Sequence, residues 1–305
     1  MHYLITGAGQ IGSQLARDLI DDGHEVTVLR RGSEAVPGTR TISADVADRE
    51  VLRDAAQGAA AIFHCIHTSY SVEAFRRDLP HRELAVMDIA AELGIPVVFP
   101  ESVYAWGRGA RDLGEEHPLA PASPLGQARA ELLAARRAHP ARTASVIASD
   151  LVGPTAHPAS AVIPMLVLAP VAKGRRAWII GDPHAPHAIT YLPDLSRAMI
   201  TAAPLASARD TRLMAPTAPA RSQREMAADA AEVLGRTPVK VSRIPTAMFA
   251  LAAPFSPSMR ELYRQRYLWA VPSSMQPGRL TSEHGLEPTP WNEVLREWAT
   301  AVNAR

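Results

Sequence analysis

The feature that most constrains the fold is a set of three closely spaced glycines between a short apolar run and an amphipathic stretch. The segment reads Thr6-Gly7-Ala8-Gly9-Gln10-Ile11-Gly12. In a turn from strand to helix, the first glycine permits the tight turn, the second lets the backbone approach a pyrophosphate, and the third lets helix and strand pack closely. The helix N-terminus at Gln10 and Ile11 adds amide donors. The segment predicts a dinucleotide site, and the alternative is a glycine-rich turn without a ligand.

Short apolar runs alternate with amphipathic stretches through the first half of the chain, a pattern typical of βαβ units around a parallel sheet. We expect strands at residues 3–6, 25–29, 39–43, 61–66, 96–99 and 143–148, and helices at residues 11–22, 48–57, 81–93 and 124–138. Gly23, Gly58 and Gly94 follow three of these helices, where a helix end favours a left-handed residue. The pattern predicts an α/β fold with a Rossmann-type, doubly wound parallel sheet.

The alternation is lost after Gly153, where prolines become dense and strands shorter. We therefore expect a Rossmann dinucleotide-binding domain over residues 1–153, to which parts of residues 177–220 can return, and a smaller substrate-binding lobe over residues 154–305. Within this lobe the pattern predicts helices near residues 162–171, 223–234, 259–269 and 291–302, and strands near residues 178–180 and 240–244.

Charge and cysteine usage limit the class of partner. The chain carries 32 Lys and Arg against 31 Asp and Glu, so no global field draws it to nucleic acid or to an anionic membrane. The single cysteine, Cys65, forms no intramolecular disulfide and is typical of a small buried hydrophobe. The longest apolar run, residues 161–172, is shorter than the roughly 20 residues that span a bilayer. We expect a cytoplasmic protein with a small-molecule substrate.

Two arginines follow the second predicted strand. Arg30 lies 18 positions after Gly12, near the place where an acidic residue would hold the adenosine ribose of NAD, and Arg31 follows it. Guanidinium groups suit a ribose 2′-phosphate, so the pair predicts NADP in preference to NAD, the alternative being two solvated loop arginines. Asp45, after the third strand, is placed to accept a hydrogen bond from the adenine amino group, or else to cap the helix that begins near residue 48.

Several separated segments resemble the extended short-chain dehydrogenase/reductase family, of the NAD-dependent epimerase/dehydratase type. They are the glycine turn, Ala44-Asp45-Val46, and residues 102–107, 149–154, 189–195 and 285–290. The resemblance covers nearly the whole chain and implies a nicotinamide dinucleotide cofactor. It does not indicate the substrate, because function depends on the site rather than on the fold.

The chain departs from this family at the catalytic pair. The family carries a tyrosine and, four positions later, a lysine, where this chain has Leu125 and Arg129. Leucine transfers no proton, and Arg129 is a poor proton shuttle, although its charge suits the nicotinamide ribose hydroxyls. Ser102 matches the family residue that bonds the substrate oxygen. Tyr104, beside Arg129, is our candidate for the acid/base role through a lowered phenol pKa, and the alternative is a packed core tyrosine.

Histidines supply further candidates. His67 follows the fourth strand, where ligands of parallel sheets bind, and is a candidate acid or base, the alternative being a polar loop residue. His64 lies within the strand and is expected in the core. His157, His184 and His187 match no zinc spacing, so we expect no metal and interpret them as exposed or substrate-loop residues.

These observations favour an NADP-binding oxidoreductase or epimerase-like enzyme that acts on a small molecule bearing a hydroxyl or carbonyl group, with non-standard acid/base residues. Two other readings stay open at the level of sequence. One is an inactive NADP-binding sensor or scaffold, and the other is a non-redox lyase or isomerase that reuses the fold. The resemblance makes a homodimer, formed through residues 81–93 and 124–138, the default assembly.

Overall fold

A seven-stranded sheet forms the centre of the computed structural model, which describes residues 1–157 and 161–303. The strand order is β12-β7-β5-β4-β1-β2-β3, and every neighbouring pair is parallel. The strands are β1 (His2–Thr6), β2 (Glu25–Arg30), β3 (Arg40–Ser43), β4 (Ile62–His64), β5 (Val97–Ser102), β7 (Thr143–Ala148) and β12 (Thr211–Met214). The predicted α/β fold with a doubly wound parallel sheet is confirmed.

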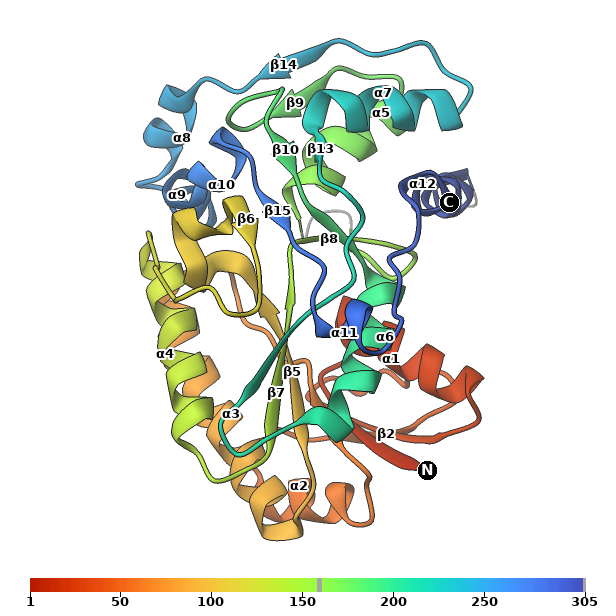
Figure 1. The fold of residues 1–305 in the computed structure, drawn as a ribbon, viewed down its shortest axis with the longest axis vertical. Helices are drawn as coiled ribbons and strands as arrows, with labels where there is room; N and C mark the ends of the chain where they lie inside the picture. Colours follow the sequence, from red (N-terminus) through yellow and green to blue (C-terminus); the bar gives the residue numbers. More distant parts are fainter. Residues whose placement is uncertain (158–160, 304–305) are drawn as a thin grey trace.

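Helices cover both faces of this sheet (Figure 1). They are α1 (Gln10–Asp21), α2 (Arg49–Ala56), α3 (Val72–Leu93), α4 (Pro124–Ala138) and α6 (Leu192–Ala202). One face packs α1 and α6 through Leu19 and Met199, whereas the other packs α2 and α3 through Leu52 and Ile89. Because side chains alternate along a strand, Ile5 of β1 joins the first cluster and its neighbour Leu4 joins the second.

Most of the remaining elements form a second group above the sheet in Figure 1, whereas α11 lies beside α6 and contacts β12. Four two-stranded pairs connect β6 (Asp112–Leu113) with β15 (Ser274–Met275), β8 (Asp150–Val152) with β11 (Ile189–Tyr191), β9 (Ala177–Ile179) with β14 (Val241–Arg243), and β10 (Pro186–His187) with β13 (Arg221–Ser222). The helices are α5 (Ala169–Ala172), α7 (Gln223–Val233), α8 (Thr246–Ala252), α9 (Pro257–Gln265), α10 (Tyr267–Ala270), α11 (Arg279–Ser282) and α12 (Trp291–Asn303). Trp106 and Tyr191 are buried in the largest apolar cluster, which extends into this group. In the described part of the chain, none of the helices has the length and apolar character that crossing a membrane requires.

Two elements were not predicted from the sequence: the edge strand β12 and the helix α6. Strand β12 pairs with β7 at the sheet edge, and α6 packs against α1. Helix α6 was missed because Pro193 lies in its first turn, where a proline is tolerated but also signals a loop.

Helix α3 is much longer than the predicted residues 81–93. It begins at Val72, is capped by the Ser71 side chain, and continues through Pro80. The prolyl ring removes one helical hydrogen bond, but Phe75 and Leu79 on the earlier turns are buried against α4. Tertiary packing therefore overrides the local helix-breaking signal.

The single helix predicted at residues 259–269 is two helices in the structure, α9 and α10.

A buried charge cluster connects α3, β5 and α4. The Arg136 guanidinium of α4 donates to Glu83 of α3 at 2.7 and 2.8 Å and to Glu101 of β5 at 2.9 Å, and its carbon lies 4.1 Å from the centre of the Phe99 ring. Glu101 also pairs with Arg129 of α4, with 3.0 Å between Nε and Oε1. Burial would raise the pKa of Glu83, but the charge and hydrogen bonds of Arg136 hold it below its ordinary value. The cluster fixes the three elements relative to one another.

We expect Arg136→Met to lower the free energy of unfolding by about 3–5 kcal/mol, since it leaves Glu83 and Glu101 buried without this partner. Urea denaturation measures the change. Arg137→Met, at the adjacent exposed position, is the matched control and should stay within about 0.5 kcal/mol of the parent protein. Equal stability of the two variants would contradict this account of the cluster.

Candidate functional site

The glycine turn lies at the carboxyl edge of the sheet, between β1 and α1, and the structure shows what each glycine does. Gly7 has a φ of +91°, in the left-handed region, and a Cβ there would lie 2.9 Å from the Ile66 nitrogen. A Cβ on Gly12 would lie 2.0 Å from the Gly7 carbonyl oxygen, so this glycine permits the close approach of helix and turn. A Cβ on Gly9 would point into open space. The backbone at Gly9 therefore leaves room for a group to approach the first turn of α1.

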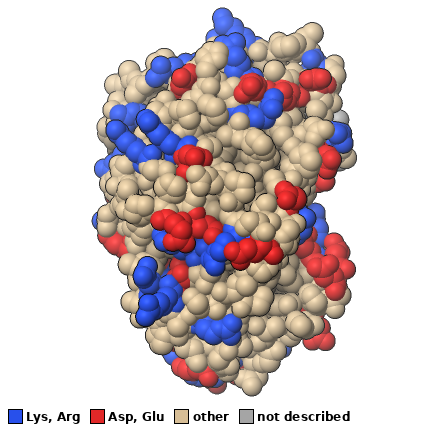
Figure 2. All heavy atoms as spheres, viewed as in Figure 1, with Lys and Arg blue, Asp and Glu red and all other residues tan. Residues whose placement is uncertain are grey.

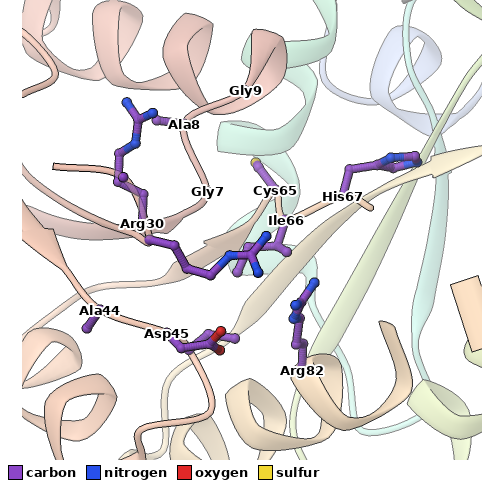
Figure 3. Close-up of a pocket in the computed structure, with 13 residues that line it drawn as sticks. Gly7, Ala8, Gly9, Arg30, Ala44, Asp45, Cys65, Ile66, His67 and Arg82 are labelled. Carbon is purple, nitrogen blue, oxygen red and sulfur yellow. The ribbon is translucent and has the colours of Figure 1, made fainter. Parts of the chain in front are cut away.

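A pocket of about 370 Å³ opens beside this turn (Figure 3). Most of its walls come from the ends of β1 to β4: Gly7 and Gly9, then Arg30 and Arg31, then Asp45, and finally Cys65, Ile66 and His67. Arg82 of α3 also lines it. The structure thus brings together six of the candidate site residues, Gly7, Gly9, Arg30, Arg31, Asp45 and His67, from four separate loops. The volume lies within the range of small-molecule sites.

Three further candidates for cofactor binding, Gln10, Ile11 and Gly12, lie in the first turn of α1 and do not line the pocket. Gln10 and Ile11 form the first turn of α1 above the buried Gly12. The Gln10 carbonyl accepts a hydrogen bond from the Thr155 hydroxyl at 2.9 Å, and its side-chain oxygen accepts from the His157 amide at 3.1 Å. A segment that follows β8 is thereby fastened to the start of α1.

Asp45 lies in the pocket wall and does not cap the following helix. The cap of α2 is Asp48, whose carboxylate accepts from the Val51 amide, whereas Asp45 accepts from the amide of Ala47. This leaves the side chain of Asp45 at the pocket surface, where a hydrogen-bond donor of a ligand can reach it. The alternative that Asp45 is the helix cap is wrong.

Ser102, Tyr104 and Arg129 lie together where β5 ends. The Arg129 guanidinium pairs with the carboxylate of Glu101, and its Nε lies 3.5 Å from the Ser102 hydroxyl oxygen. Tyr104 follows in a short helical segment, and α4 approaches its carbonyl closely because Gly126 has no side chain: a Cβ there would lie 2.5 Å from that oxygen. The arrangement places the Ser102 hydroxyl beside the Arg129 guanidinium, whose charge also acts on the Tyr104 phenol.

The electrostatic expectation for Tyr104 is wrong. Burial and the nearby Asp150 carboxylate raise the pKa of Tyr104 to about 12, and these effects outweigh the opposing charge of Arg129. Tyr70 donates a hydrogen bond to the Tyr104 oxygen at 3.3 Å. The phenol therefore stays protonated at neutral pH, which suits a proton donor and not a base.

His67 is open to the pocket, but its imidazole is neutral. The protein around the ring and the charge of Arg129 lower the pKa of His67 to about 4. Nδ1 donates to the Thr68 carbonyl at 2.7 Å, which fixes the tautomer and leaves Nε2 as an acceptor. His64, by contrast, is buried and hydrogen-bonded to Thr6 at 2.7 Å, as expected of a core residue.

Leu125 is fully buried in the first turn of α4. It belongs to an apolar cluster with Phe75, Leu79 and Leu132, which joins α3 to α4. Its side chain is therefore part of the packing between these helices.

A polar cluster around Asp150, whose charge acts on Tyr104, was not predicted from the sequence. The Asp150 carboxylate accepts from His187 Nε2 and Trp269 Nε1, both at 3.2 Å. His187 is buried, so its interpretation as an exposed or substrate-loop residue is wrong. No spacing signal joins residues so far apart in sequence. The one hint was that Asp150 follows a strand of the parallel sheet.

Metal-binding groups and surface charge give no further indication of a ligand. No group of three or more His, Cys, Asp and Glu side chains within residues 1–157 and 161–303 is arranged to hold a metal ion. On the face shown in Figure 2, basic and acidic side chains are interspersed.

Comparison with known proteins decides the family. The model of the NAD dependent epimerase/dehydratase family matches residues 3–212. The chain belongs to this family. No curated protein matches the sequence.

Solved structures of the same fold include UDP-glucose 4-epimerase of Thermotoga maritima with UDP-glucose, at 17% identity and a TM-score of 0.78, over 100% of this chain and 99% of that one. The Thermus thermophilus UDP-glucose 4-epimerase complex with NAD has 20% identity and a TM-score of 0.74, over 99% of each chain. DesIV, a dTDP-glucose 4,6-dehydratase of Streptomyces venezuelae with NAD bound, has 19% identity and a TM-score of 0.76, over 100% of this chain and 98% of that one.

The glycines make a paired test of the pocket. Gly9→Ala should leave the free energy of unfolding within about 0.5 kcal/mol of the parent, because the new methyl enters open space, yet weaken nucleotide binding by filling the approach to α1. Gly12→Ala should cost several kcal/mol, since its methyl overlaps the Gly7 carbonyl. Urea denaturation and calorimetric titration with NADPH separate the two effects. Unimpaired binding by Gly9→Ala would contradict the role of this turn.

Proposed function

We propose that the protein is an NADP-dependent enzyme of the epimerase/dehydratase family that acts on a small molecule bearing a hydroxyl or carbonyl group. The observation that carries the proposal is the pocket in which the glycine turn, Arg30 and Arg31 at the end of β2, and Asp45 after β3 face one space. This is the arrangement that a dinucleotide requires at the carboxyl edge of a parallel sheet.

The residues present fit such a cofactor. The open space at Gly9 leads to the first turn of α1, whose amides and partial positive charge favour a pyrophosphate. Arg30 and Arg31 supply forked donors for a ribose 2′-phosphate, and the site has no acid at that point to receive the 2′-hydroxyl of NAD. The bound cofactor would supply hydride exchange at a carbon that bears an oxygen. The preference for NADP distinguishes this proposal from the neighbours that contain NAD.

The chain's own residues have three roles in this proposal. Ser102 orients the substrate oxygen by a hydrogen bond. Tyr104, kept protonated by its high pKa, donates a proton to that oxygen as negative charge develops. Arg129, held by Glu101, supplies a fixed positive charge next to both groups. Because Tyr104 donates a proton, these roles favour the reduction of a substrate carbonyl over the oxidation of a hydroxyl.

Nucleotide sugars are the first substrates to screen. The family model and three neighbouring structures of nucleotide-sugar enzymes support this choice, since two neighbours are UDP-glucose 4-epimerases and one is a dTDP-glucose 4,6-dehydratase.

A second candidate function is a cofactor-binding sensor or scaffold without turnover. The burial of Leu125 among apolar side chains favours it, because a leucine at this position offers no proton. Oxidation of NADPH by nucleotide 4-keto sugars, or by a panel of aldehydes and ketones, would exclude this candidate.

The cofactor proposal predicts that NADPH binds at least tenfold more tightly than NADH, about 1.4 kcal/mol, as measured by calorimetric titration. Replacing both Arg30 and Arg31 by alanine should remove this difference by weakening the binding of NADPH alone. Arg40→Ala, an exposed arginine at the start of β3, is the control. If NADH bound as tightly as NADPH to the parent protein, the proposed preference would be wrong.

The catalytic proposal predicts that Tyr104→Phe slows carbonyl reduction by about 10²–10⁴-fold while nucleotide affinity is unchanged. Because the pKa of Tyr104 is raised to about 12, the rate should not fall as pH passes the ordinary phenol value of 10.0. Tyr3→Phe, whose hydroxyl contacts Met1 away from the site, is the control. Full turnover by Tyr104→Phe would exclude the phenol as proton donor.

A further inference from the structure

Arg82 is a nearly buried cation that forms no ion pair with any carboxylate among the described residues. Only 7% of the residue is exposed, and Nη1 is buried with no hydrogen-bond partner among the described residues. Nor does any ion pair in the described part of the chain include it. Arg136, buried to a similar degree, donates to two carboxylates and a hydroxyl. Burial of a guanidinium is costly unless a counter-charge is present, so the two arginines differ in what stabilises them.

The Arg82 side chain lies in the wall of the same pocket as the glycine turn. It rises from α3 and points toward the space next to Ile66 and Asp45 (Figure 3). Asp45 shares the pocket, but no ion pair joins it to Arg82 within 4 Å. The acid one turn earlier on the helix, Asp78, is already hydrogen-bonded to Arg77 and Thr68. Among the described residues, no carboxylate therefore lies within 4 Å of this guanidinium, although its charge contributes to the lowered pKa of Asp78.

The charges of the side chains around the pocket favour an anionic ligand. Arg30 and Arg31 line it from the end of β2 and Arg82 from α3, against the single carboxylate of Asp45, while His67 is neutral. Three guanidinium groups around one cavity suit a phosphate, which accepts forked hydrogen bonds from arginine.

We propose that Arg82 binds a phosphate group of the dinucleotide and completes, from α3, the anion site that Arg30 and Arg31 form on the other side of the pocket. The inference rests on the dinucleotide binding proposed above. The ligand phosphate is either the ribose 2′-phosphate or the 5′-pyrophosphate, since both present the same oxygens. In either position the phosphate supplies the counter-charge that the unliganded protein lacks.

Calorimetric titration of Arg82→Met with NADPH and with NADH tests the assignment. Methionine keeps the apolar stem and removes the charge, and we expect at least a tenfold loss of affinity. A loss confined to NADPH assigns Arg82 to the 2′-phosphate, and an equal loss for both nucleotides assigns it to the pyrophosphate. Arg76→Met, an exposed position on the same helix that pairs with Glu131, is the matched control and should bind as the parent does.

Thermal unfolding without nucleotide supplies the second readout. Removing an unpaired buried charge should leave the melting temperature unchanged or higher, whereas a purely structural role would lower it and leave affinity intact. Arg82→Lys, which keeps the charge but not the planar fork, should fold and still lose affinity. Parent-like affinity in Arg82→Met or Arg82→Lys overturns this inference alone. Failure of the parent protein to bind either nucleotide overturns the proposed function as well.

Discussion

The buried ion pairs of Arg136 and Arg129 with Glu101 organise the site. Glu101 is the penultimate residue of β5, and each of its oxygens receives a different arginine of α4. Because these two arginines lie seven residues apart, they point from the same face of the helix, and the strand end is held along two turns of α4. Ser102 follows directly, and its amide donates to the same carboxylate at 2.8 Å. The position of the Ser102 hydroxyl is thus a consequence of charge pairing in the core.

The pairing also explains how a guanidinium is kept next to Tyr104 without being drawn into solvent. Arg129 is 8% exposed, and its partner Glu101 is more deeply buried. A lysine in this place would carry its charge on a flexible stem, whereas the planar fork of arginine contacts the carboxylate and still faces the hydroxyl of Ser102. The site therefore combines an immobile positive charge with a phenol that resists ionisation, which differs from a pair in which a cation lowers the phenol pKa.

The sequence predicted the sheet because its signals are local. Glycines, apolar runs of strand length and helix caps each report on a few neighbouring residues, and they agreed through the first 150 residues. It failed where distant packing decides the outcome. The helix predicted to begin at residue 81 begins at Val72, because Phe75 and Leu79 pack on α4.

The same reason limited prediction of the site. The pocket residues were recognised because each follows a strand, and such positions converge in a parallel sheet. Arg82 lies within a helix, so its direction toward the pocket depends on how α3 lies on the sheet. The pKa of Tyr104 depends on burial and on Asp150, which lies in β8, far from Tyr104 in the sequence. Neither feature has a local signature.

Because α6 and β12 come late in the sequence, the sheet is covered late during synthesis of the chain. During synthesis, a nascent chain of 150 residues has every strand of the nucleotide half except β12, but the apolar side of α1 and of the sheet has no cover until Leu195 and Met199 have emerged. The loop that fastens Gln10 also emerges late, 145 residues after it. The parallel sheet therefore stays partly uncovered during synthesis, and its core closes only after Met214, the last residue of β12, has been made.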